Sequence, residues 1–99
     1  MFALETRIAT DNPETQFPLI HGNGNSGKQL GTQYFEALRA LNAFQEKFYQ
    51  IEFHQRDYYP MGDEAWLKAR AQWEAQKANI ASLRHFLDSH AAHCFESVR

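Results

Sequence analysis

The chain has 99 residues, of which 43% are hydrophobic and 22% are charged, with a formal net charge of −2. This composition fits one small globular domain and excludes a disordered chain, which would combine few hydrophobic residues with a high net charge. The slightly acidic balance also argues against duplex nucleic acid as a partner, because that affinity depends on many cationic contacts to phosphate.

The single cysteine, Cys94, cannot form an intramolecular disulfide, and a chain without disulfides suits a reducing compartment. The first residues do not combine a basic segment with an apolar run, so they do not read as a signal peptide. No stretch approaches the roughly 18 apolar residues of a membrane helix. We therefore expect a cytoplasmic protein without a membrane partner.

Residues 1–27 contain Pro13, Pro18 and a Gly/Asn-rich loop and show no sustained helical period. This pattern predicts an extended arm followed by a loop, with room for one short strand or helical turn. Large apolar side chains in the arm would order it on a neighbour's surface. These side chains are Phe2, Leu4, Ile8, Phe17, Leu19 and Ile20.

A first helix is predicted from Lys28 to about Gln55, with Ser26 as its N-cap. Its apolar residues recur at spacings of three and four, which places them on one stripe. The stripe consists of Leu30, Tyr34, Leu38, Leu41, Phe44, Phe48 and Ile51. The segment from Arg56 to Gly62 breaks the period and contains Pro60, so it predicts the turn of a hairpin.

A second helix is predicted from Asp63 to about Phe95, because Asp63 and Glu64 supply the negative charge that a helix N-terminus favours. Its apolar stripe consists of Trp66, Ala69, Trp73, Ile80, Leu83, Leu87, Ala91 and Cys94. Trp66 and Trp73 share one side of this helix, where packing in the core is expected.

The expected fold is all-α: a long antiparallel helical hairpin over residues 28–99 with an extended N-terminal arm over residues 1–27, in one domain. Each helix would be about 40 to 50 Å long, and two such rods cover only one side of each other. Phe35, Phe53 and Phe86 would widen the apolar faces further. Because small domains bury little surface alone, we expect self-association into an oligomeric helical bundle.

The loop before the first helix satisfies the spacings G-x-G-x-x-G and G-x-x-x-x-G-K. Glycine amides, a helix N-terminus and a lysine together suit a phosphate group. A nucleotide triphosphatase would also need a preceding strand and a Ser or Thr where Gln29 stands. The alternative is a flexible linker that only caps the helix. The candidate ligand-binding residues of this loop are Gly24, Asn25, Ser26, Gly27 and Lys28.

The turn offers a second candidate site, formed by Arg56, Tyr58 and Tyr59. Tyrosines stack on bases and an arginine clamps phosphate, which is how sequence-tolerant nucleotide binding works. In the structural alternative, Arg56 pairs with Asp57, one tyrosine fills the end of the bundle, and Pro60 with Gly62 fixes the turn.

The loop and the turn lie at opposite ends of a predicted rod about 40 Å long, so they do not meet within one chain. They meet if two hairpins pack antiparallel across a symmetric interface. A composite pocket between subunits is the resulting hypothesis.

A histidine- and cysteine-containing cluster near the C-terminus invites a metal interpretation, with His90 spaced three and four residues from His93 and Cys94. Together with His85 these residues still fall short of a closed site, and a structural role is favoured. We predict no metal, no cofactor and no catalytic residues, since no nucleophile or shifted acid pair stands out.

The stretches from His21 to Gln29 and from Arg56 to Gly62 resemble short uncharacterised proteins of phage and proteobacterial genomes, over most of residues 17–95. This resemblance implies a phage or mobile-element origin, and hence the host cytoplasm. In size and architecture the chain is also similar to the helical-hairpin sponge proteins with which phages sequester cyclic oligonucleotides in anti-CBASS and anti-Thoeris defence.

Two functions are expected from these features. The first is a non-enzymatic homo-oligomer that sequesters a nucleotide-like phosphorylated ligand, plausibly a cyclic oligonucleotide immune signal. The second is a small protein-interaction module or inhibitor that docks on a host or phage protein through exposed apolar surface.

Overall fold

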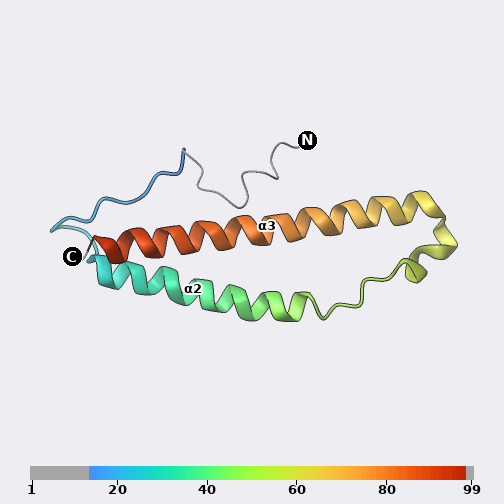
Figure 1. Ribbon diagram of the computed structural model, residues 1–99, viewed down its shortest axis with the longest axis horizontal. Helices are drawn as coiled ribbons and strands as arrows, with labels where there is room; N and C mark the ends of the chain where they lie inside the picture. Colours follow the sequence, from blue (N-terminus) through green and yellow to red (C-terminus); the bar gives the residue numbers. More distant parts are fainter. Residues whose placement is uncertain (1–13, 98–99) are drawn as a thin grey trace.

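The computed structural model describes residues 14–97, which form an elongated helical hairpin measuring 61 × 28 × 17 Å (Figure 1). Helix α2 spans Gly27–Phe48, a short 3₁₀ helix η1 spans Gln55–Met61, and α3 spans Asp63–Glu96. No strand occurs between residues 14 and 97. α2 and α3 run antiparallel side by side, which confirms the predicted all-helical hairpin (Figure 1).

The start of α2 is fixed by its predicted cap. The Gln29 backbone N–H donates to the Ser26 hydroxyl oxygen at 3.0 Å, which satisfies one of the amides that a helix N-terminus leaves without a partner. One turn later, Gly31 is buried against α3. A Cβ atom at Gly31 would lie 3.0 Å from the Phe95 ring, so the absence of a side chain allows the two helices to approach closely here.

The end of α2 differs from the prediction, because the helix stops at Phe48 and does not continue to about Gln55. The amides of Gln50 and Ile51 donate to carbonyls three residues earlier, at 3.1 Å each, so the last turn tightens before the helix ends. Residues 52–54 then continue without helical structure as far as η1.

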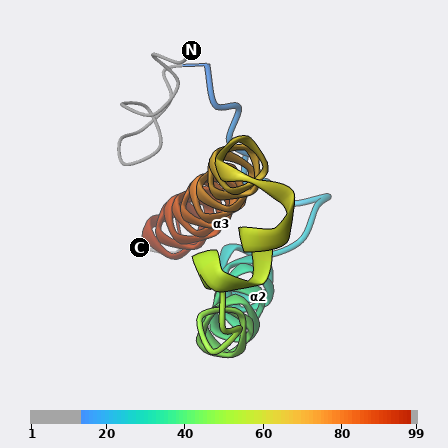
Figure 2. The ribbon, with the colours of Figure 1, turned by 90° about the vertical axis from the view of Figure 1, so that its right-hand side faces the viewer.

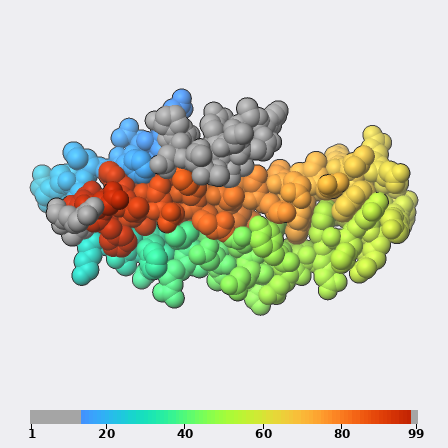
Figure 3. Space-filling model, in the orientation of Figure 1, coloured from blue at the N-terminus to red at the C-terminus, as the bar shows by residue number. Residues whose placement is uncertain are grey.

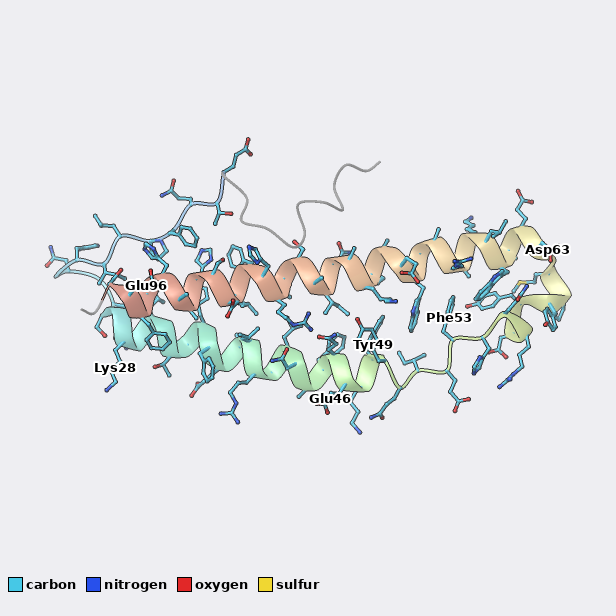
Figure 4. The ribbon with its side chains drawn as sticks, in the orientation of Figure 1. Lys28, Glu46, Tyr49, Phe53, Asp63 and Glu96 are labelled. Atoms are coloured by element: carbon cyan, nitrogen blue, oxygen red, sulfur yellow. The ribbon has the colours of Figure 1, made fainter. Side chains whose placement is uncertain are left out.

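A stack of aromatic rings explains this early end. Trp73 is stacked between Phe48, at 4.6 Å between ring centroids, and Phe53, at 4.5 Å. In a continuous helix, five residues separate Phe48 from Phe53 by about 140° around the axis, so both rings would not reach Trp73. Leaving the helix after Phe48 brings Phe53 onto α3 (Figure 4). We call Phe48, Phe53, Tyr58, Trp66 and Trp73 the aromatic stack.

The rest of the aromatic stack joins η1 to the first turns of α3. The Phe53 ring also lies 5.1 Å from Trp66, and Tyr58 lies 5.8 Å from both Phe53 and Trp66. Figure 2 shows η1 closing this end of the hairpin. Gly62 separates η1 from α3 with a φ of 94°, a conformation that favours glycine, and Asp63 and Glu64 occupy the first turn of α3 as predicted.

The N-terminal arm packs on α3 of its own chain where the structure describes it, and its contact with a neighbour's surface stays a prediction. The Phe17 ring lies 4.8 Å from both His90 and His93 of α3. His93 Nε2–H donates to the Pro18 carbonyl at 2.8 Å. Figure 3 shows this part of the arm against the C-terminal half of α3. The expected apolar residues Phe2, Leu4 and Ile8 lie outside the described residues.

The hairpin buries few hydrophobic side chains. Within residues 14–97, those that are buried are Ile80, Ala91 and Cys94. In the same part of the chain, eleven large hydrophobic residues are between 41 and 82% exposed, which leaves much of their surface in contact with water. They are Leu19, Phe35, Phe44, Tyr49, Ile51, Tyr59, Met61, Leu67, Leu83, Phe86 and Phe95.

Replacing Trp73 with alanine tests the aromatic stack. We expect Trp73→Ala to lower the free energy of unfolding by about 3 kcal/mol, because both stacked neighbours lose their partner. Leu67→Ala is the control, since Leu67 is 59% exposed and its loss should cost less than about 0.5 kcal/mol. Urea unfolding followed by circular dichroism measures both. Equal effects would show that the stack does not hold this end together.

Candidate functional site

The two predicted halves of the ligand site lie at opposite ends of the hairpin. In Figure 4, Lys28 and Glu96 mark one end and Asp63 marks the other. The structure brings Gly24, Asn25, Ser26, Gly27 and Lys28 together at the first end. It brings Arg56, Tyr58 and Tyr59 together in η1 near the second. One chain therefore does not assemble the complete predicted site.

Several polar groups of the loop already have partners within the chain. The Gly24 N–H donates to the His21 carbonyl and the Asn23 N–H to His21 Nδ1, each at 3.2 Å. The Ser26 hydroxyl caps α2, and Gly27 is buried. Lys28 is exposed. The loop thus retains the lysine charge for an anion, but it uses part of its donors to hold its own turn.

The electrostatics of this end also weaken the attraction for an anion. The N-terminus of α2 carries partial positive charge, and the C-terminus of α3 carries partial negative charge. The antiparallel arrangement places these two termini side by side, with the Phe95 ring against Gly31. Since the two partial charges oppose each other, an anion at this end would depend mainly on the Lys28 ammonium group.

At the other end, η1 divides its two tyrosines between different roles. Tyr58 is half-buried within the aromatic stack. Tyr59 is 68% exposed, and Arg56 is exposed as well. In a 3₁₀ helix, side chains three residues apart eclipse each other, so Arg56 and Tyr59 project from the same side of η1. Arg56 and Asp57 form no ion pair with each other, although the structural alternative assumed one.

Two open clefts, which no sequence pattern predicted, flank the non-helical segment between α2 and η1. One, of about 470 Å³, is lined by residues that include Tyr49, His54 and Arg70. The other, of about 620 Å³, is lined by residues that include Asp57 and Gln72, and Phe53 and Trp73 border both. Because both faces of Phe53 and of Trp73 are covered by other rings of the stack, these rings offer mainly their edges to a ligand.

The histidines of the C-terminal cluster take part in packing. His90 Nδ1–H donates to the Phe86 carbonyl at 2.9 Å, and its ring stacks on Phe86 at 4.0 Å. His93 holds the Pro18 carbonyl of the arm. Among residues 14–97, no group of three or more histidine, cysteine, aspartate or glutamate side chains is arranged to hold a metal ion.

Comparisons with known proteins leave the family of the chain open. No family model matches it, and neither a curated protein nor a solved structure is significantly similar to it. Within the described part of the chain, none of the helices is long and apolar enough to cross a membrane.

Cys94 gives a chemical test of the packing between α2 and α3. Its side chain is fully buried, and burial raises the pKa of the thiol above its ordinary value of 9.0. Because the thiolate is the nucleophile, we expect Cys94 to react with a disulfide reagent such as DTNB only when the hairpin opens. Burial of the thiol leaves stability unchanged at neutral pH, where Cys94 is protonated in both the folded and the unfolded chain, and it destabilises the fold as the pH rises above about 9.

The measurement compares the rate of DTNB labelling in buffer with the rate in denaturing urea. At least a tenfold slower reaction in buffer is expected. Equal rates would show that the helices open freely around Cys94.

Proposed function

We propose that the protein is a non-enzymatic interaction module, which acts by docking its uncovered apolar surface onto another polypeptide. The observation that carries the proposal is the balance of burial: three hydrophobic residues are buried within residues 14–97, against eleven large ones that are at least 41% exposed. Large contiguous apolar surfaces on a single chain are typical of sites of protein association.

The geometry changes the order of the two functions expected from the sequence. The ligand-binding hypothesis needs the loop and the turn in one place, and these lie at opposite ends of the hairpin (Figure 4). The docking hypothesis needs exposed aromatic and aliphatic side chains on rigid helices, and Phe44, Leu83 and Phe86 meet that need. Its partner is a second copy of the chain or another protein of the same cell.

A tagged protein, cross-linked in cells and then purified, tests this function. We expect the wild type to retain a polypeptide partner. The combined variant Phe44→Glu, Leu67→Glu, Phe86→Glu should retain at least tenfold less of this partner, because charged side chains resist burial. The matched control is Thr32→Glu with Ser82→Glu, which adds charge at exposed polar positions. Recovery of the wild type with no polypeptide partner of any kind would contradict the proposal.

A second candidate function is the sequestration of a nucleotide-like phosphorylated ligand, such as a cyclic oligonucleotide. One observation favours it: Arg56 and Tyr59 are both exposed on one side of η1, where an arginine can hold phosphate and a tyrosine can stack on a base. Lys28 and the loop from a second chain would complete the pocket in an antiparallel assembly.

Binding of cyclic dinucleotides, measured by isothermal titration calorimetry, tests this second function. Tyr59→Ala, Arg56→Ala and Lys28→Ala should each weaken binding at least tenfold, because each removes a stacking or charged contact. Tyr59→Phe is the control, since it keeps the aromatic face. An affinity that none of the three alanine variants changes would exclude this site.

A further inference from the structure

The two helices carry a matching pair of stripes without charge. On α2 the spacing of four, three and four residues aligns Gln33, Ala37, Ala40 and Phe44, and on α3 the spacing of three, four and three aligns Gln76, Asn79, Leu83 and Phe86. All eight residues are exposed. None of them is Asp, Glu, Lys or Arg, although 22% of the chain is charged. We call these eight residues the uncharged face.

Three contacts between the helices place both stripes on the same broad side of the hairpin. Arg84 Nε donates to Asn42 Oδ1 at 3.2 Å, the Lys77 ammonium lies 6.0 Å from the centre of the Tyr49 ring, and Phe95 packs at Gly31. At about 100° per residue, each stripe is turned roughly a quarter to a half turn away from the residues that make these contacts. The stripes therefore flank the groove between the helices on the opposite broad side.

The same contacts show that the apolar ends of the two stripes lie at one level along the hairpin. Asn42 lies opposite Arg84, and Tyr49 lies opposite Lys77, so facing positions have residue numbers that add to 126. The middle of the Ala40–Phe44 pair is position 42, and the middle of the Leu83–Phe86 pair falls between positions 84 and 85. The apolar centre of the uncharged face thus crosses both helices at the level of Asn42 and Arg84.

We propose that the uncharged face binds a second copy of this chain. The two hairpins stack face to face and antiparallel, about a twofold axis that crosses the hairpin at the level of Asn42 and Arg84. Each helix then packs on its own counterpart and forms a four-helix bundle. Ala37 and Ala40 allow the backbones to approach, while Phe44, Leu83 and Phe86 fill the centre. This inference rests on the proposed function and names its partner.

Charge at the edge of the face agrees with this symmetry. Glu36 and Lys47 are exposed and border the α2 stripe. They lie almost equally far from position 42, on opposite sides of it. An antiparallel partner therefore places Glu36 of one chain opposite the Lys47 of the other, twice in each dimer. A parallel arrangement of the two α2 helices would place like charges together.

The broad side that carries the uncharged face is also large enough for a dimer interface. Viewed down the shortest axis, as in Figure 1, the hairpin measures 61 × 28 Å. A stable interface buries about 800 Å² on each partner, which is roughly half of one such side. Phe44, Leu83 and Phe86 lie at the centre of the uncharged face, with the polar Gln33 toward one end of the hairpin and Gln76 and Asn79 toward the other.

Analytical ultracentrifugation over a concentration series tests the dimer with a matched pair of variants. Phe44 and Phe35 are similarly exposed, at 52 and 47%, but Phe35 lies on the other side of α2. We expect a wild-type mass of twice 11.5 kDa, a dimer dissociation constant at least tenfold weaker in Phe44→Glu, and little change in Phe35→Glu. Circular dichroism confirms that each variant keeps its helices.

Charge reversal tests the antiparallel arrangement. Glu36→Lys should weaken the dimer about threefold to tenfold, because two favourable pairs become repulsive, and combining it with Lys47→Glu should restore wild-type affinity. A monomeric wild type, equal effects of Phe44→Glu and Phe35→Glu, or no restoration would each overturn the inference. A monomer that still retains another polypeptide in the cross-linking experiment would overturn the inference alone, whereas a monomer that retains none would contradict the proposed function as well.

Discussion

The insertion of Trp73 between Phe48 and Phe53 is the interaction on which the shape of the molecule depends. α3 has 34 residues and α2 has 22, so about 18 Å of α3 extends past the end of α2. Residues 49–62 must cover this length. The aromatic stack lets them do so, because it fixes Phe53 on α3 without a helical ladder and supports η1 through Tyr58 and Trp66.

Elsewhere the hairpin depends on a narrow buried seam, which is the line of contact between α2 and α3. Ile80, Ala91 and Cys94 are the buried hydrophobic side chains within residues 14–97, and of these Cys94 is fully buried. The seam is narrow because two helices shield only one side of each other. The side chains that remain exposed divide unevenly: those beside the Arg84–Asn42 contact are mixed with charges, whereas those of the uncharged face are not. This asymmetry separates a solvated side from a side suited to association.

The sequence predicted those parts of the fold that depend on local patterns. Periodic apolar residues located both helices, Ser26 located the first cap, and Asp63 with Glu64 located the start of α3. It missed the end of α2, because Ile51 continues the apolar period while the decisive contact, from Phe53 to Trp73, joins residues twenty positions apart. The packing of Phe17 on His90 and His93 joins residues that are still farther apart in the sequence, and no local pattern predicts it.

The candidate site was less predictable than the fold. Motif spacing grouped Gly24 with Lys28 and Arg56 with Tyr59, but spacing carries no information on which donors a loop uses for its own turn. It also did not separate Tyr58, which packs, from Tyr59, which is exposed. The uncharged face could be identified only from the contacts between the helices, because these contacts show that the two stripes lie on one side of the hairpin.

The constant pairing between α2 and α3 also limits how the gene can change in length. Asn42 with Arg84 and Tyr49 with Lys77 share one alignment, so a residue inserted within either helix would shift every later pair and rotate the following side chains by about 100°. Residues 50–54 take part in no such pairing except through Phe53. Natural variation in chain length should therefore accumulate on either side of Phe53, where the protein can absorb it without disturbing the helices.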